Sequence, residues 1–315
     1  MRKLPALPSV RKLPALLVTA ALVASLSACA TAPAPGSAGC TAPASGNASN
    51  VVSATGKFGE KPTVTVPTPI NTSHTEVSTL IEGSGRILTD GTPALIEYTI
   101  YSGATGKEVQ ASSYGTPAAP ITVGATKGGP LVDALECSRV GSRIAVAVKA
   151  SDLSSTTGKT DTTSGPAYVA VIDIKRAFLP KADGALQLGV NDMPAVVTAP
   201  NGAPGISVPD VAAPTKEVVQ LVRKGSGHRL MAKDTAVVQF TAVDWAAKPT
   251  VQESSWTNGD AATTIPLGDA TLPEQFKKAL VGQTVGSQVM VVIPPSATSS
   301  TATTSIYVFD VLGSL

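Results

Sequence analysis

The residues that could support covalent or metal chemistry are few and scattered. Ser84 and Ser226 each lie between two glycines, but neither has the Gly-x-Ser-x-Gly spacing of a hydrolase nucleophile. The two histidines, His74 and His228, are too few and too isolated to indicate a Ser-His-acid triad, and the three cysteines show no metal-ligand spacing. We therefore expect neither a metal nor a cofactor.

The amino terminus predicts export. Residues 1–28 carry four basic residues and no acid, and the apolar run 13–24 is too short for a stable transmembrane helix, as is typical of a signal peptide. The signal ends in Leu26-Ser27-Ala28-Cys29, which resembles the bacterial lipobox, where the cysteine sulfur receives diacylglycerol. We expect lipidation at Cys29, which would place the protein on the extracytoplasmic face of the cell membrane. The alternative is a plain secretory signal with a chance cysteine.

The other two cysteines, Cys40 and Cys137, form an even pair. In an oxidising compartment an even pair favours a disulfide, so we predict one bridge that ties the segment after the anchor to the first domain. Two independent buried thiols are the alternative.

Charge argues against nucleic acid as a partner. The whole chain has 24 basic and 22 acidic residues, and the signal accounts for four of the basic ones. The mature chain is therefore close to neutral and has no basic block that could bind phosphates.

The length of 315 residues suits two domains, and the sequence contains a repeat at an offset of about 142. The matching segments keep the same order in both copies: 82–86 with 224–228, 94–99 with 236–241, 112–114 with 254–256, 140–142 with 285–287, and 171–174 with 308–311. Residues 29–55 and 180–204 are rich in small residues, proline and glycine, and are predicted to be a flexible tether and a linker. The two domains are then 56–179 and 205–315.

Each domain is predicted to be mostly β. Residues 218–223, 236–245, 289–293 and 306–312 are rich in Val, Ile and aromatics and are predicted to be strands. One helix is expected after a capping box formed by Thr271 and Glu274, and a shorter one is expected over 130–137. The fold class is α+β, with a helix packed on a twisted antiparallel sheet in each domain.

The second domain resembles the FKBP-type peptidyl-prolyl cis-trans isomerases. The segments that carry the resemblance are the strand 237–241, the Glu253-Ser254-Ser255-Trp256 turn, Pro266-Leu267-Gly268, the helix end 280–287, Val291 to Pro295 and the closing strand 308–312. The resemblance covers residues 217–315, and it extends more weakly to the first domain, chiefly through the repeat. The whole arrangement is similar to that of two-domain exported lipoproteins of Gram-positive bacteria, and it implies two FKBP-like half-barrel domains.

The resemblance implies a membrane-anchored isomerase or folding factor that acts on Pro-containing segments of exported proteins. Rotation about an X-Pro bond has a barrier near 20 kcal/mol, because amide resonance is lost in the twisted state. A pocket that binds the twisted imide better than the planar one accelerates rotation tenfold for every 1.4 kcal/mol of preference. Such catalysis requires no nucleophile, metal or cofactor.

The resemblance also implies the site residues of the second domain. The catalytic positions correspond to Phe240, Glu253, Phe276 and Phe309, and the substrate-binding positions to Trp256, Ile265, Leu272, Pro273 and Tyr307. Trp256 is expected at the pocket rim. Two aromatic positions of the family are occupied here by Gln252 and Thr263, and a backbone N–H donor falls either on Pro273, which has none, or on Leu272.

The first domain departs further from the family. It keeps Tyr98, but the floor residue becomes Leu131, the turn acid becomes Ala111, and Lys127-Gly128 precede the helix. We therefore expect this domain to be non-catalytic. Two other functions stay open for the protein: a non-catalytic FKBP-like binding or chaperone module, and a surface scaffold, which full burial of the Phe240, Phe276 and Phe309 rings would favour.

Overall fold

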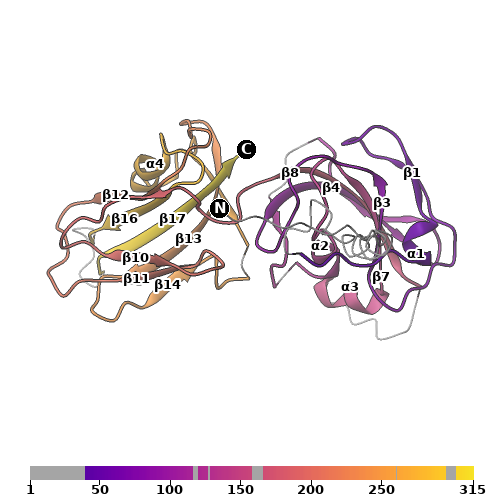
Figure 1. Cartoon of the computed structure of the whole chain (residues 1–315), viewed down its shortest axis with the longest axis horizontal. Helices are drawn as coiled ribbons and strands as arrows, with labels where there is room; N and C mark the ends of the chain where they lie inside the picture. Colours follow the sequence, from indigo (N-terminus) through magenta and orange to yellow (C-terminus); the bar gives the residue numbers. More distant parts are fainter. Residues whose placement is uncertain (1–39, 116–119, 127, 158–165, 260, 296–302) are drawn as a thin grey trace, which may run out of the picture. The chain divides into compact units, whose positions relative to one another are not determined.

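A computed structural model describes residues 40–115, 120–126, 128–157, 166–259, 261–295 and 303–315 (Figure 1). The signal peptide and Cys29, the predicted lipidation site, lie outside the described residues. Two large antiparallel sheets dominate the described chain. We call the first sheet with its covering segments the first lobe and the second sheet with its own the second lobe. Among the described residues, no helix combines the length and apolarity needed to cross a bilayer.

The first sheet has the strand order β3-β7-β8-β4-β5, and β6 pairs separately with β4. Its strands are β3 (Glu76–Ile81), β4 (Pro93–Ser102), β5 (Glu108–Ala111), β6 (Ile121–Thr122), β7 (Arg143–Val148) and β8 (Tyr168–Ala177). The long central strands β4 and β8 are rich in the β-branched and aromatic residues that favour strands. Their pairing places Tyr98 opposite Ile172 and Ile100 opposite Ala170.

The second sheet repeats this topology in the order β12-β16-β17-β13-β14, with β15 on β13 and a short β9 beyond β12. Its strands are β9 (Ala185–Leu186), β12 (Val218–Lys224), β13 (Thr235–Asp244), β14 (Val251–Ser254), β15 (Thr263–Pro266), β16 (Gln288–Ile293) and β17 (Ser305–Ser314). Here Phe240 lies opposite Phe309 and Ala242 opposite Tyr307. The expectation of two antiparallel sheets with few short helices is confirmed.

Short helices cover one face of each sheet, which we call the front face. In the first lobe these are α2 (Pro130–Asp133) and α3 (Ala150–Thr157), and in the second lobe α4 (Glu274–Leu280). The predicted capping box is wrong: Pro273 is the N-cap residue of α4, and no side chain caps the helix. The Asp269 carboxylate instead accepts hydrogen bonds from the backbone N–H and the hydroxyl of Thr271, both at 2.8 Å.

The opposite, back face of each sheet is also covered. Over the first sheet lie α1 (Asn47–Asn50) and a hairpin of β1 (Ser53–Thr55) and β2 (Thr63–Thr65). Over the second lies a hairpin of β10 (Ala195–Thr198) and β11 (Pro204–Ser207). The ranges expected to be a tether and a linker, 29–55 and 180–204, thus contain ordered elements in their described parts.

A buried aspartate lies on each back face, beneath the segment that precedes the sheet. In the first lobe the Asp173 carboxylate accepts hydrogen bonds from the Arg143 guanidinium at 2.6 and 2.8 Å and from Gly59 N–H at 2.6 Å. In the second lobe Asp310 accepts hydrogen bonds from the Gln288 amide at 2.7 Å and from Ala182 N–H at 2.9 Å. Burial raises the pKa of Asp310 to about 6, and its hydrogen bonds and the charges of Arg223 and Lys181 offset this only in part.

The raised pKa of Asp310 predicts a pH-dependent stability. The folded state binds this proton more tightly than the unfolded chain, so the contribution is fully present below about pH 4 and is lost as the pH rises through 6. Its size is about 3 kcal/mol at 1.36 kcal/mol per pKa unit. Urea unfolding of Asp310→Asn between pH 4 and 7 should lack this loss, whereas the exposed control Asp192→Asn should keep it. Parallel pH profiles for the wild type and Asp310→Asn would contradict the assignment.

Candidate functional site

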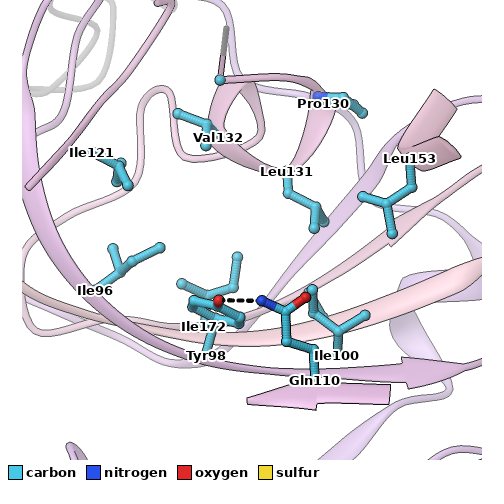
Figure 2. A pocket seen from close by; sticks show the side chains of 12 residues that line it. Ile96, Tyr98, Ile100, Gln110, Ile121, Pro130, Leu131, Val132, Leu153 and Ile172 are labelled. Atoms are coloured by element: carbon cyan, nitrogen blue, oxygen red, sulfur yellow. Dashed lines mark hydrogen bonds between the residues drawn. The ribbon is translucent and has the colours of Figure 1, made fainter. Parts of the chain in front are cut away.

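A cavity of about 330 Å³ lies in the first lobe between the front face of the sheet and α2 and α3 (Figure 2). Strands β4 and β8 form its floor, Leu131 and Val132 of α2 lie above it, and Leu153 reaches it from α3. Its lining residues are almost all aliphatic: Ile96, Tyr98, Ile100, Gln110, Ile121, Gly128, Pro130, Leu131, Val132, Leu153, Ala170 and Ile172. None of them is charged.

Two residues with polar side chains, Tyr98 and Gln110, line this cavity. The Gln110 side-chain amide nitrogen donates a hydrogen bond of 2.8 Å to the Tyr98 hydroxyl, as the dashed line in Figure 2 shows. Tyr98 is half-buried on β4, and Gln110 is exposed on the neighbouring β5. The site can therefore bury an apolar group while offering one neutral polar pair, and it can hold no metal with these residues.

The second lobe gathers the predicted aromatic residues. The ring of Phe276 on α4 lies 4.8 Å from that of Tyr307 and 5.3 Å from that of Phe309, both in edge-to-face geometry. The Phe240 ring lies 5.8 Å from Phe309, and Tyr307 stacks on Phe309 at 6.0 Å. Phe309 is 2% exposed, whereas the other three rings are half-buried. The cluster is therefore not fully buried. Full burial of the rings is the condition that would have favoured a pure scaffold.

The remaining predicted residues lie in different surroundings. Ile265 and Leu272 pack against the same core as the four rings. Glu253 is exposed on β14, and burial, followed by the charge of Glu253, raises the pKa of the Tyr307 hydroxyl. Trp256 is only 7% exposed, and its ring leaves no room for a Cβ at Gly202, so the structure does not place it at a rim.

The predicted backbone donor is not offered at either candidate position. The Leu272 N–H donates to the Asp269 carbonyl oxygen at 3.3 Å within the loop, and Pro273 has no N–H. A ligand in the second lobe would therefore have to find its hydrogen-bond donor elsewhere.

The strand register shows that smaller side chains line the first-lobe cavity at the positions that carry rings in the second lobe. Ala170 occupies the position of Tyr307, and Ile172 that of Phe309. Leu131 packs on the first core as Phe276 packs on the second. Three smaller side chains thus replace three rings. Sequence reasoning missed this cavity, although the repeat alignment already matched Ile172 with Phe309 and the family resemblance already placed Leu131 at the floor position of Phe276.

The register also corrects one assignment in the first lobe. Glu253 pairs with Ala242 on β13, and the residue that pairs with the matching Ile100 on β4 is Gln110, whereas Ala111 pairs with Thr99. The expectation that Ala111 replaces the turn acid is therefore off by one residue, and Gln110, which lines the cavity, is the true counterpart. Lys127 lies outside the described residues.

A disulfide joins Cys40 to Cys137, with the two Cα atoms 5.6 Å apart, and confirms the predicted bridge. Cys137 follows α2, whose residues lie above the cavity. The backbone N–H of Thr41 also donates to the Glu136 carboxylate at 3.4 Å. The bridge therefore fastens the start of the described chain to the segment above the cavity.

No protein-family model and no curated protein matches this sequence. Solved structures of FKBP domains are similar to it at low identity. The three FKBP domains of wheat FKBP73 are 15% identical with a TM-score of 0.29, over 76% of this chain and 94% of theirs. FkpA from Escherichia coli is 20% identical with a TM-score of 0.27, and the match covers 38% of this chain and 51% of FkpA. A putative peptidyl-prolyl cis-trans isomerase, FKBP12 from Mycobacterium tuberculosis, is 21% identical with a TM-score of 0.26, and the match covers 32% of this chain and 86% of that one.

Proposed function

We propose that this protein is a folding factor that binds apolar, proline-containing segments of exported polypeptides in the first-lobe cavity. The observation that carries the proposal is the uncharged, aliphatic cavity of about 330 Å³ between the front face of the first sheet and its helices. Its volume lies in the range of small-molecule sites, and its lining suits a side chain of proline or a similar apolar residue.

The energetics of such a site suit transient holding. Burying one apolar side chain contributes about 1.5 to 3 kcal/mol, and each 1.4 kcal/mol changes the dissociation constant tenfold. A segment held by one residue therefore binds weakly and leaves quickly. A factor that releases its client for folding needs this property.

We also propose that the protein acts at the extracytoplasmic face of the membrane, anchored through an acylated Cys29. The lipobox-like sequence before Cys29 supports the anchor, and the Cys40–Cys137 disulfide is consistent with an oxidising compartment.

Filling the cavity should weaken ligand binding strongly. Leu131→Trp places an indole in the space that a ligand would occupy, so we expect at least tenfold weaker binding of a labelled Ala-Leu-Pro-Ala peptide, measured with the full chain by fluorescence anisotropy. Leu188→Trp is the matched control, because Leu188 is 95% exposed. Equal thermal melting temperatures would show that both variants are folded. An unchanged affinity in folded Leu131→Trp would refute the cavity as the binding site.

A second candidate function, peptidyl-prolyl isomerisation in the second lobe, is favoured by the ring cluster. Phe240, Phe276 and Tyr307 are half-buried around Phe309, so they could form an apolar wall for a twisted imide.

Truncating the ring on α4 tests this second candidate. We expect Phe276→Ala to slow the catalysed isomerisation of a Leu-Pro peptide about tenfold or more, measured without protease at matched folded fraction. The control is Leu131→Ala, its counterpart in the first lobe. Loss with Leu131→Ala alone would place catalysis in the first lobe. If the folded wild type gives only the uncatalysed rate, the isomerase function is refuted and the binding function stands.

A further inference from the structure

We propose that the Tyr98 hydroxyl donates a hydrogen bond to the carbonyl oxygen of an Xaa-Pro amide held in the first-lobe cavity, and that Gln110 positions this hydroxyl. The inference rests on the proposed binding function and names the chemical group that the same site recognises. It begins with the neutral pair formed by Tyr98 and Gln110 (Figure 2).

The Tyr98 hydroxyl accepts a hydrogen bond and still has its own proton to donate. A tyrosine hydroxyl has one proton to donate and lone pairs that accept. The Gln110 amide nitrogen donates to this oxygen at 2.8 Å, which uses a lone pair and leaves the proton available. Among the described residues, Tyr98 makes no other side-chain hydrogen bond. Because the hydroxyl borders the cavity, its proton can be donated to a ligand there.

The second lobe carries a different residue at the position of Gln110. There the register places Glu253 on β14 and Phe240 on β13. An ionised carboxylate only accepts hydrogen bonds, so next to a tyrosine it would accept the hydrogen bond that the phenol hydroxyl can donate. The first lobe combines a phenol with an amide donor, whereas the second combines a carboxylate with a ring that has no hydroxyl. Only the first combination leaves a proton available to a ligand.

The neutral lining selects the class of ligand. Among the described residues no charged side chain lines the cavity, so an anionic ligand would lose its hydration without gaining a cationic partner from them. A tertiary Xaa-Pro amide is neutral, lacks an N–H and offers only its carbonyl oxygen as an acceptor. A single hydrogen-bond donor in an aliphatic cavity matches that group.

The test compares two ligands. One is the Ala-Leu-Pro-Ala peptide, and the other is its (E)-alkene isostere, in which the Leu-Pro amide is replaced and the carbonyl oxygen is missing. The ratio of their affinities for the full chain, measured by calorimetry, isolates the hydrogen bond. We expect the wild type to prefer the amide three- to tenfold. Tyr98→Phe should abolish this preference, and Tyr168→Phe should retain it, because Tyr168 packs on the same core but does not line the cavity.

A pH series tests the role of Gln110. In Gln110→Glu the ionised carboxylate would accept the hydrogen bond from the Tyr98 hydroxyl, so the preference for the amide ligand should vanish at pH 7. The preference should return as the pH falls towards the ordinary carboxyl pKa near 4. The wild-type preference should stay constant over that range. In a Tyr98→Phe background, Gln110→Glu should change the ratio no further.

The outcomes separate the two proposals. If neither ligand binds to the folded wild type, the binding function itself is wrong. If both bind equally well, or if Tyr98→Phe keeps the amide preference, the binding function stands and the role of Tyr98 is refuted. A pH-independent ratio in Gln110→Glu would refute the positioning role of Gln110.

Discussion

Replacing Arg143 by methionine should lower the free energy of unfolding by about 3 to 5 kcal/mol, the cost of breaking a buried ion pair on one side. Arg143 is 0% exposed and hydrogen-bonds both oxygens of Asp173. Its guanidinium also donates to three backbone carbonyl oxygens, those of Gly56 at 3.0 Å, Lys57 at 2.9 Å and Glu60 at 3.3 Å. Methionine fills similar space but leaves a buried carboxylate and three carbonyls without this donor.

Urea unfolding at pH 7 measures the effect, and the second lobe provides the control. Gln288 occupies the register position of Arg143, opposite Asp310 instead of Asp173. We expect Gln288→Met to cost clearly less, because a neutral amide is lost from a carboxyl whose pKa is already raised. The double variant Arg143→Met with Asp173→Leu should recover much of the loss, since it leaves no unpaired charge. A cost below 1 kcal/mol for Arg143→Met would contradict this account.

Removing the disulfide should cost about 2 to 5 kcal/mol of stability. Cys40 and Cys137 are separated by 97 residues, so the bridge restricts a long loop of the unfolded chain. Cys40→Ser with Cys137→Ser should therefore unfold at lower urea concentration than the oxidised wild type. Because Cys137 follows α2, the double variant should also bind the cavity ligand more weakly.

Reduction supplies an internal control for the bridge. Dithiothreitol should shift the wild type to the stability of the double serine variant and should leave that variant unchanged. An oxidised wild type with the same midpoint as the double variant would show that the bridge does not stabilise the fold.

The sequence predicted most of the fold because its determinants are local or repeated. Strand composition and the shared order of the repeat indicated two antiparallel sheets, and an even cysteine pair indicated the disulfide. The ring cluster followed from the family resemblance, which placed Phe240, Phe276 and Phe309 at one site. These signals depend on residue type and spacing, which survive in a single sequence.

The parts that were missed depend on comparison across strands. The chain from Ala242 to Glu253 is one residue longer than the chain from Ile100 to Gln110, so an ungapped alignment chose Ala111 where the pairing selects Gln110. The cavity exists because Ala170, Ile172 and Leu131 are smaller than their counterparts, and only packing shows that the space stays open. The covering hairpins are short and rich in small or turn-forming residues, so their composition resembled that of a linker.

The covering hairpins change where a fragment of this chain can begin. Each cover precedes the long strands of its own sheet in the sequence, so a piece that starts at residue 205 would lack the cover strand β10 and the edge strand β9. It would also lose Ala182, whose N–H donates a hydrogen bond to Asp310. The side chains of Met290, Ile306 and Val308, which the hairpin covers, would be exposed to water. Such a fragment would be prone to aggregation for reasons unrelated to its active surface. An autonomous second lobe must start near residue 180.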